Sequence, residues 1–425
     1  MRIGIISDLH LGFRQYGSIE RENDFYNQFY TVCSDMNKQS PDIVIIAGDL
    51  FNNPNPSPAA IHAYREGIKM LDADMVFAIK GNHTMVLRDN HYSIDEFFGK
   101  NQFRHYYLLD DTSITTFGAS INDDRLKEKY ESEVNVHIEG LTYRNNSSIQ
   151  EFIETQKFLS EQKVLEGTYR VLVVHQAFSE FCGFIGEELS ITDINYEPYD
   201  LIICGHIHSR MNTMLNKKTL FVQPGSIERM NTTEARDEAK NGKGFYIVDT
   251  NDNSCKFYQV ECPRKFFLGD ITVDDNFSII DFYRKLLKTT SKLKIAPIIS
   301  YKFHNQTQNI AEIRENILSK KENILIDNSS IYDETQNDDI SIEVTDSEMP
   351  TIMSVLKSRL KEEFNEKNSN FTLDLFNLLK NDSDDVGVFL DDYLEENKKE
   401  INVIEDDYKD EIEELKEFFN NLGGA

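Results

Sequence analysis

The feature that most constrains the fold is a series of seven short apolar runs in residues 1–262, which polar and helical stretches separate. Short apolar runs bounded by turn residues are typical of buried strands, and strands that alternate with helices indicate a layered α/β or α+β domain. Because the runs are apolar throughout, we expect a sheet that is covered on both faces. The runs are Ile3–Ile6, Ile43–Ala47, Val76–Ile79, Val171–Val174, Leu201–Cys204, Leu220–Val222 and Phe245–Val248.

The stretches between these runs complete the predicted first domain, residues 1–262. Apolar residues at helical spacing predict helices over 20–38 and 58–72. Further strands are expected at 113–120 and 133–141.

The pattern changes after residue 262. Strand-like and helix-like segments then alternate as βαβαβ, which predicts a small second domain over 263–330. Residues 331–370 begin with an acidic, polar stretch and are expected to be a linker. Residues 371–425 carry two runs of helical apolar spacing, 371–398 and 401–422, each predicting an amphipathic helix with an acidic outer face.

The net charge of −28 is concentrated near the C-terminus. Residues 331–425 contribute −18 and residues 1–330 only −10. An acidic excess argues against a protein that coats nucleic acid by charge alone, since such binding depends on Lys and Arg that neutralise phosphates. It does not exclude a nuclease.

Other features exclude several classes of protein. No run approaches the roughly 18 apolar residues that span a bilayer, and the first residues lead directly into a strand-like segment instead of a signal peptide. We therefore predict a soluble, cytoplasmic protein. The five cysteines form no CxxC pair, which favours reduced thiols over disulfides or a thiolate zinc site. No GxxxxGK[ST] phosphate loop is present, so the chain has no ATPase of its own.

Five of the apolar runs are followed at once by side chains that bind metals. Ligand sites of open α/β sheets form at the carboxyl ends of strands, where such side chains gather. In two of the five segments, paired ligands at i and i+2 fall on the same side of an extended backbone. The segments are Asp8-Leu9-His10, Gly48-Asp49, Gly81-Asn82-His83, His175-Gln176 and Gly205-His206-Ile207-His208.

These segments predict a centre of two metal ions. Two carboxylates, one amide oxygen and four imidazoles are too many donors for one tetrahedral ion, and suit two divalent ions that share a bridging carboxylate. With nitrogen and oxygen donors, Mn²⁺, Fe²⁺ and Zn²⁺ are all compatible. Such a pair of ions supports phosphoester hydrolysis. The predicted ligands are Asp8, His10, Asp49, Asn82, His175, His206 and His208.

The ordered motifs D-x-H, G-D, G-N-H, H and G-H-x-H resemble those of the calcineurin-like metallophosphoesterase superfamily, which implies a four-layer β-sandwich of the α/β class. Within it, the chain is most similar to the SbcD or meiotic-recombination-eleven type of nuclease subunit in double-strand-break repair. The stretches that carry this similarity are Ser7–Gly12, Ala47–Phe51, Pro56–Pro58, Gly140–Tyr143 and Gln223–Ser226.

The resemblance implies a role for each predicted site residue. One ion would be held by Asp8, His10, Asp49 and His208, and the other by Asp49, Asn82, His175 and His206. His83 would face the scissile phosphate as a catalytic residue, which suits an imidazole as general acid. The sequence departs from many relatives at two positions, Asn52 in place of a second active-site histidine and Thr84 in place of aspartate.

The resemblance also implies an activity and partners. It implies a Mn²⁺-dependent 3′–5′ exonuclease and single-strand or hairpin endonuclease, nucleoid-associated in a prokaryote, whose 263–330 domain caps the site and binds DNA ends, hairpins and single strands. It further implies that 371–422 docks on a coiled-coil SMC-like ATPase of the SbcC type. A homodimer through helices 58–72 and 89–98 would complete a heterotetramer.

Two other functions are compatible with the same residues. A small-molecule or cyclic-nucleotide phosphodiesterase or phosphatase would use the same metal cluster, and hydrolysis of bis-p-nitrophenyl phosphate against DNA ends discriminates between them. A catalytically inactive scaffold is the alternative that is not an enzyme. It is disfavoured because every ligand position is filled.

Overall fold

The structure is a computed structural model that describes residues 1–84, 93–99, 103, 105–115, 135–182, 189–274, 277–305 and 324–333. The chain divides into two units, residues 1–337 and 338–425. The predicted helices of 371–425, most of the predicted linker and the second helix-like segment of the βαβαβ pattern, residues 309–320, lie outside the described residues. No described helix is long and apolar enough to cross a membrane.

Six strands form the first sheet, in the order β12-β11-β1-β2-β3-β4. Strands β1 to β4 are parallel to one another, and β11 and β12 continue the sheet as antiparallel strands. Their bounds are β1 Arg2–Ile6, β2 Ile43–Ile46, β3 Met75–Ile79, β4 Tyr106–Leu109, β11 Gly244–Asp249 and β12 Ser254–Gln259.

The second sheet also has six strands, in the order β5-β6-β7-β8-β10-β9. The four central strands are parallel, and β5 and β9 are antiparallel edge strands. Their bounds are β5 Thr112–Thr115, β6 Val136–Leu141, β7 Tyr169–His175, β8 Leu201–Gly205, β9 Met211–Met214 and β10 Leu220–Gln223.

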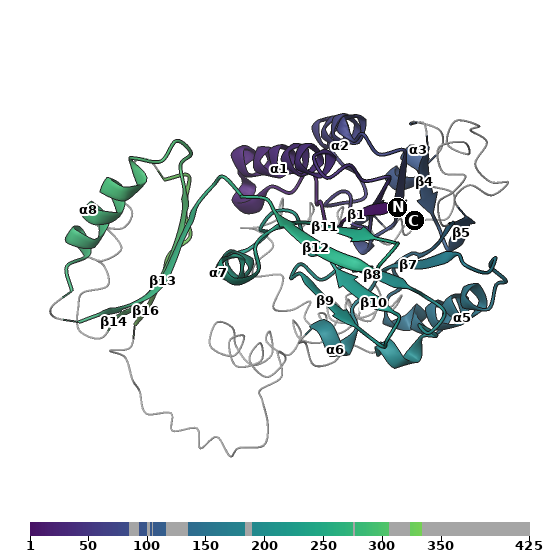
Figure 1. Cartoon of the computed structure of the whole chain (residues 1–425). Coiled ribbons are helices and arrows are strands. Elements are labelled where there is room, and N and C mark those ends of the chain that lie inside the picture. The colour runs from purple at the N-terminus through teal and green to yellow at the C-terminus, as the bar shows by residue number, and fades with distance from the viewer. Residues whose placement is uncertain are drawn as a thin grey trace, which may run out of the picture. The chain divides into compact units, whose positions relative to one another are not determined.

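The two sheets pack face to face and helices cover their outer faces. The core between the sheets includes Ile3 and Ile45 from one sheet and Val171 and Ile203 from the other, all fully buried. Helices α1 (Ile19–Asn37), α2 (Pro58–Met70) and α3 (Ile94–Gly99) cover the first sheet, and α5 (Ile149–Ser160) and α6 (Ser179–Cys182) cover the second (Figure 1). This four-layer α/β sandwich confirms the predicted fold class. Strands β2, β3, β8 and β10 are buried on both faces, and so is most of β1 and β7, which explains the uninterrupted apolar runs.

Local signals in the sequence set where the main helices begin. The Ser18 hydroxyl accepts a hydrogen bond from the Arg21 main-chain N–H at 3.2 Å at the start of α1. Ser57 caps α2 in the same way, and Pro58 follows as the first helical residue, where no hydrogen bond is lost. Shorter elements are α7 Thr232–Asn241 and the 3-10 helices η1 Gln15–Gly17, η2 Asn82–Thr84, η3 Asn146–Ser148 and η4 Ile191–Asp193.

A third sheet lies within residues 266–333 and has its own core. Strand β13 pairs along one side of β14, and β15 and β16 pair in succession along β14, all in parallel. One face of α8 packs on this sheet through Ile279, Tyr283 and Leu286, which contact the same cluster as Phe303. The bounds are β13 Phe266–Val273, α8 Ile279–Thr290, β14 Ile298–Asn305, β15 Ile326–Asp327 and β16 Ser330–Asp333.

The packing of α1 on α2 depends on Gly67. A Cβ atom at this position would lie 2.1 Å from the ring of Phe29, a fully buried residue of α1. Alanine favours helix over glycine by about 1 kcal/mol, but overpacking of a core costs about 1–3 kcal/mol. We therefore expect Gly67→Ala to lower the free energy of unfolding by up to about 2 kcal/mol in denaturant titrations.

Lys69→Ala on the same helix is the control. The Lys69 side chain is 47% exposed, and its ammonium pairs with the exposed Glu66 carboxylate at 2.7 Å. Its loss is expected to change stability by less than about 0.5 kcal/mol. A Gly67→Ala variant more stable than the wild type would show that the helix packing tolerates a methyl group.

Candidate metal centre

The five predicted segments meet at one edge of the sandwich. Strands β1 and β2 are parallel neighbours, with Ile6 opposite Ile46, so the loops that follow them start side by side. The Asp8 N–H donates to the Gly48 carbonyl at 3.1 Å and the His10 N–H donates to the Asp49 carbonyl at 3.0 Å. In the second sheet, His175 at the end of β7 lies opposite Gly205 at the end of β8. The carboxyl ends of both sheets therefore supply the site.

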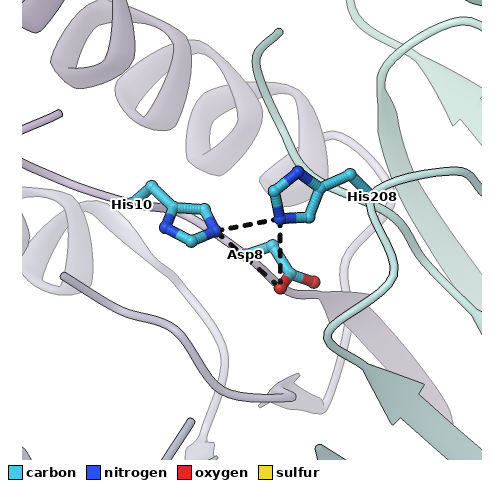
Figure 2. Close-up of side chains that lie close together, drawn as sticks. All are labelled: Asp8, His10 and His208. Atoms are coloured by element: carbon cyan, nitrogen blue, oxygen red, sulfur yellow. Dashed lines mark hydrogen bonds and ion pairs between the residues drawn. The ribbon is translucent and has the colours of Figure 1, made fainter. Parts of the chain in front are cut away.

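One group of donors consists of Asp8, His10 and His208. The Nε2 atoms of His10 and His208 lie 3.1 Å apart, and Asp8 Oδ1 lies 4.0 Å from the first and 3.9 Å from the second. Figure 2 shows the two rings with these nitrogens turned toward each other and toward the carboxylate. His10 comes from the loop after β1 and His208 from the loop after β8, so the group joins the two sheets.

The Asp49 carboxylate lies between this group and a second one. Asp49 Oδ2 is 3.7 Å from His10 Nε2 and 3.1 Å from His175 Nε2. Its other oxygen, Oδ1, accepts a hydrogen bond from the His83 main-chain N–H at 3.0 Å. A carboxylate with donor atoms on both sides is the arrangement that a bridging ligand needs.

The second group contains Asn82, His175 and His206 beside Asp49. The Asn82 side-chain oxygen Oδ1 lies 3.1 Å from His175 Nε2 and 3.0 Å from His206 Nδ1. Asn82 belongs to η2, which follows β3 of the first sheet, whereas both histidines follow strands of the second. All seven predicted ligands thus lie in two neighbouring groups that share Asp49.

Four of the seven predicted ligands have strained backbone conformations. Their φ angles are 52° at Asp8, 45° at His10, 49° at Asp49 and 83° at His206. Residues other than glycine rarely adopt a positive φ, and such strain concentrates at functional sites, where the surrounding structure maintains it. Here the Asp8 carboxylate accepts from the His206 main-chain N–H, with both oxygens at 3.2 Å.

Two glycines allow the segments to approach this closely. A Cβ atom on Gly81 would lie 2.1 Å from Asp49 Oδ1, and one on Gly205 would lie 1.9 Å from the Ala47 carbonyl oxygen. Neither distance is possible for a real side chain, and in both cases the neighbouring atom belongs to a strand end or to a predicted ligand. The glycines of the G-N-H and G-H-x-H segments are therefore required by packing at the site.

Burial and neighbouring charge set the protonation of the donors. Burial lowers the pKa of His206 to about 3 and also lowers the pKa of His10, so both rings are neutral at pH 7. Burial opposes ionisation of Asp49, but the neighbouring His175 outweighs it and holds the pKa of that carboxyl below its ordinary value. In return, Asp49 overcomes the effect of burial on His175 and raises its pKa to about 9.

Two of the histidines are oriented by hydrogen bonds to their Nδ1 atoms. The Nδ1–H of His175 donates to the Ala47 carbonyl oxygen at 2.7 Å, and that of His208 donates to Glu234 Oε1 at 2.9 Å. With the proton at Nδ1, the Nε2 lone pair of each neutral ring points into the site. Glu234 is a residue that the sequence analysis missed, because it lies 26 positions from His208 on α7 and no local pattern connects them.

His83 lies at the edge of the two groups. Its ring packs edge-on against the His10 ring, with 4.6 Å between centroids, and its Nδ1–H donates to the Asn52 main-chain carbonyl oxygen at 2.8 Å. One of its ring nitrogens lies within 4.8 Å of donor atoms of His10 and Asp49. Asn52 is one of the two positions where the sequence departs from many relatives, and its main-chain carbonyl orients the His83 ring. At the other, Thr84, the side chain is fully buried.

The donor set fits two divalent cations. Ligand atoms bound at about 2.1 Å in tetrahedral geometry lie about 3.4 Å apart, close to the separations within both groups. The Nε2 atoms of His10 and His208 face each other at 3.1 Å, so one ring donates a hydrogen bond to the other in the absence of a cation, and both nitrogens are placed to reach the same cation. Oxygen and nitrogen donors without thiolate suit Mn²⁺, Fe²⁺ or Zn²⁺.

Comparison with known proteins identifies the family. A family model described as calcineurin-like phosphoesterase matches residues 1–210, the part of the chain that contains every predicted ligand and His83. The chain belongs to the calcineurin-like phosphoesterase family. It is accordingly a metal-dependent phosphoesterase with a dinuclear site for divalent ions, and the donor groups described above are candidates for that site.

Two relatives match nearly the whole of this phosphoesterase, and a third matches about two thirds of it. "DNA double-strand break repair protein Mre11" of Methanococcus maripaludis is 28% identical over 410 residues, which cover 92% of this chain and 98% of the relative. The protein of the same name from Sulfolobus acidocaldarius is 27% identical over 407 residues, covering 94% and 97%. That of Methanocaldococcus jannaschii is 27% identical over 295 residues, covering 68% and 73%.

The raised pKa of His175 predicts that metal binding releases protons. Before a cation binds, this imidazole holds a proton up to about pH 9, and the cation needs its lone pair. At pH 7 we expect release of about one to two protons as two ions bind, because the pKa of His208 is also raised. Apparent affinity should rise about tenfold per pH unit for each proton released, and level off above pH 9.

Calorimetry of Mn²⁺ binding in buffers of different protonation enthalpy measures this release. The same titration of a His83→Ala variant is the control, since His83 is not a predicted ligand and the proton count should not change. Binding without proton release at pH 7 would contradict the assignment of His175 as a ligand.

Proposed function

We propose that this protein is a Mn²⁺-dependent DNA nuclease that processes the ends of double-strand breaks. The observation that carries the proposal is the shared Asp49 carboxylate, with donors for one ion on each side and His83 beside it. The similarity to double-strand-break repair proteins over more than nine-tenths of the chain favours DNA as the substrate. We propose 3′–5′ exonuclease activity and endonuclease activity on single strands and hairpins.

The ligands divide into two sets around Asp49. We propose that Asp8, His10, Asp49 and His208 hold one ion, and that Asp49, Asn82, His175 and His206 hold the other. Neighbouring donors lie 3.1–4.0 Å apart in the first set and 3.0–3.1 Å apart in the second, which supports this division. When bound, two divalent ions would neutralise charge on the phosphoryl group. They would also lower the pKa of water, so that hydroxide is available as the nucleophile at neutral pH.

His83 is proposed as the general acid. In hydrolysis, an oxygen from water bonds to phosphorus, the bond from phosphorus to the 3′ oxygen breaks, and the leaving oxygen takes up a proton. The Nδ1–H of His83 is engaged by the Asn52 carbonyl, so Nε2 is the ring nitrogen that faces a substrate. General acid catalysis of this kind accelerates reactions by about 10²–10⁴-fold.

The acidic net charge does not prevent DNA from reaching this site. Residues 1–330 carry a net charge of −10, and two divalent cations add four positive charges at the site itself. Substrate approach depends on the local field more than on the total charge. We propose that residues 1–262 form the nuclease domain and that residues 263–330 cap the site and contact DNA.

A homodimer is proposed through α2 and α3. The two helices share a core, where the rings of Tyr64 and Phe98 pack edge to face at 4.9 Å. Each also leaves a large apolar side chain exposed, Met70 at 39% and Phe97 at 49%. A large exposed apolar side chain on each helix supports this placement of the interface.

Cleavage of end-labelled duplex and single-stranded DNA tests the proposed activity. We expect degradation with Mn²⁺ and none with EDTA. His83→Ala should lower the rate by about 10²–10⁴-fold while Mn²⁺ affinity stays unchanged, because the residue donates a proton and binds no metal. Absence of Mn²⁺-dependent cleavage by the wild type would overturn the proposal.

Hydrolysis of bis-p-nitrophenyl phosphate provides the matched control. Nitrophenolate leaves without needing a proton, so His83→Ala should affect this reaction far less than DNA cleavage. Equal losses on both substrates would contradict the general-acid role. A wild type that hydrolyses only this ester would favour a small-molecule phosphodiesterase instead.

The acidic C-terminal segment is proposed to bind a partner protein. Amphipathic helices commonly lie with their apolar face in a groove of another protein, and we propose that 371–422 docks on a coiled-coil SMC-like ATPase. Truncation after residue 365 should leave Mn²⁺-dependent cleavage intact and abolish co-purification with that ATPase. Co-purification of the truncated protein would exclude this segment as the docking element.

A further inference from the structure

A buried ionic network lies directly behind His208. It centres on Glu234 of α7, whose side chain is 11% exposed, and Lys243, whose side chain is 6% exposed. The Lys243 ammonium donates to Glu234 Oε2 at 2.9 Å, to the Ser226 hydroxyl at 2.6 Å and to the His208 carbonyl at 3.1 Å. Buried charges are costly unless they are paired and hydrogen-bonded, so a network at this position needs a reason.

Both oxygens of the Glu234 carboxylate are in use. Oε1 accepts from His208 Nδ1 at 2.9 Å. Oε2 accepts from Lys243, from the Ser226 hydroxyl at 3.1 Å and from the Met230 main-chain N–H at 3.3 Å. Only a carboxylate offers acceptors at both ends, because an amide of the same shape has one acceptor and one donor.

The main chain around Glu234 is fixed as well. The Glu234 N–H donates to the side-chain oxygen of Asn231 at 2.8 Å, which orders the first turn of α7. Lys243 directly precedes β11, and the Ser226 N–H donates to the His208 carbonyl at 3.2 Å. Lys243, Ser226 and the Met230 main chain thus hold the Glu234 carboxylate, and His208 is the predicted ligand that it contacts.

We infer that Glu234 is a positioning residue for the metal centre. It accepts the Nδ1 proton of His208 and thereby leaves the Nε2 lone pair of that ring free to bind a cation beside His10 and Asp8. This inference rests on the proposed assignment of His208 as a ligand. Carboxylates behind ligating histidines fix the tautomer and the ring orientation, and their loss typically lowers metal affinity by about 10–100-fold. Lys243 and Ser226 hold the carboxylate in place.

Mn²⁺ titration of Glu234→Gln by calorimetry, without DNA, tests the inference. The glutamine keeps the size of the side chain but must turn its NH₂ group toward either His208 or Lys243, both of which are donors. We expect the affinity for one of the two Mn²⁺ ions to fall by about 10–100-fold and that for the other to stay unchanged. Unaltered affinity for both ions would overturn the inference.

Glu139→Gln is the matched control. Glu139 is fully buried on β6 and accepts from Arg170 and from the Tyr199 hydroxyl, so its substitution also removes a buried, paired charge. It should destabilise the fold and leave both Mn²⁺ affinities at the wild-type values. Equal loss of metal affinity in the two variants would show a general effect of stability and would refute a specific role of Glu234.

Glu234→Asp keeps the inference testable if the glutamine variant does not fold. Aspartate keeps the charge and both acceptor oxygens, but its side chain is shorter by one methylene group, so the carboxylate lies farther from His208. Affinity for one ion should fall, and wild-type affinity for both would refute the role. Since Mn²⁺ binding is measured without DNA, a wild type that binds two ions and cleaves no DNA would refute the proposed function alone.

Discussion

The site depends on the position of the Asp49 carboxylate. One oxygen lies between His10 and His175, which come from different sheets, and the other accepts from the His83 main chain. A single side chain therefore relates both donor groups and the predicted catalytic imidazole. Because the protonated His175 stabilises its negative charge, Asp49 is ionised and available at neutral pH, whereas burial alone would favour its protonated form.

The sandwich supplies the rigidity that this arrangement needs. Four predicted ligands adopt positive φ angles, a conformation that costs on the order of 1–3 kcal/mol each. Parallel strands of both sheets end directly before these residues, and the strands are buried on both faces. A closely packed core resists the small movements that would relax the strained residues, so the fold's stability is used to maintain the geometry of the site.

The protonation of the site follows from the same packing. Burial keeps His10 and His206 neutral, while the carboxylates of Asp49 and Glu234 raise the pKa values of His175 and His208. The Ala47 carbonyl and Glu234 hold the Nδ1 protons of these two rings. The first effect prepares lone pairs for a cation, and the second orients rings that must lose a proton when the cation binds. Burial thus lowers the pKa of two of the four histidines, and neighbouring carboxylates raise the pKa of the other two.

The apolar runs and the residues that follow them were predictable, because both are local properties of the chain. Strands β1, β2, β3, β7 and β8 begin and end within two residues of the predicted runs, and the five metal-binding segments lie at their carboxyl ends. Periodicity and turn residues act over a few positions, and a sheet brings strand ends together whatever the intervening sequence.

Tertiary structure alone decided which atoms face each other. His10 and His208 are 198 positions apart, and their Nε2 atoms meet only because two sheets pack. The partner of His208, Glu234, and the use of the Asn52 main chain to orient His83 leave no trace in local pattern. Ring orientation depends on hydrogen bonds between distant elements. The sequence therefore determined which candidate ligands this protein carries, and packing determined how their rings are oriented.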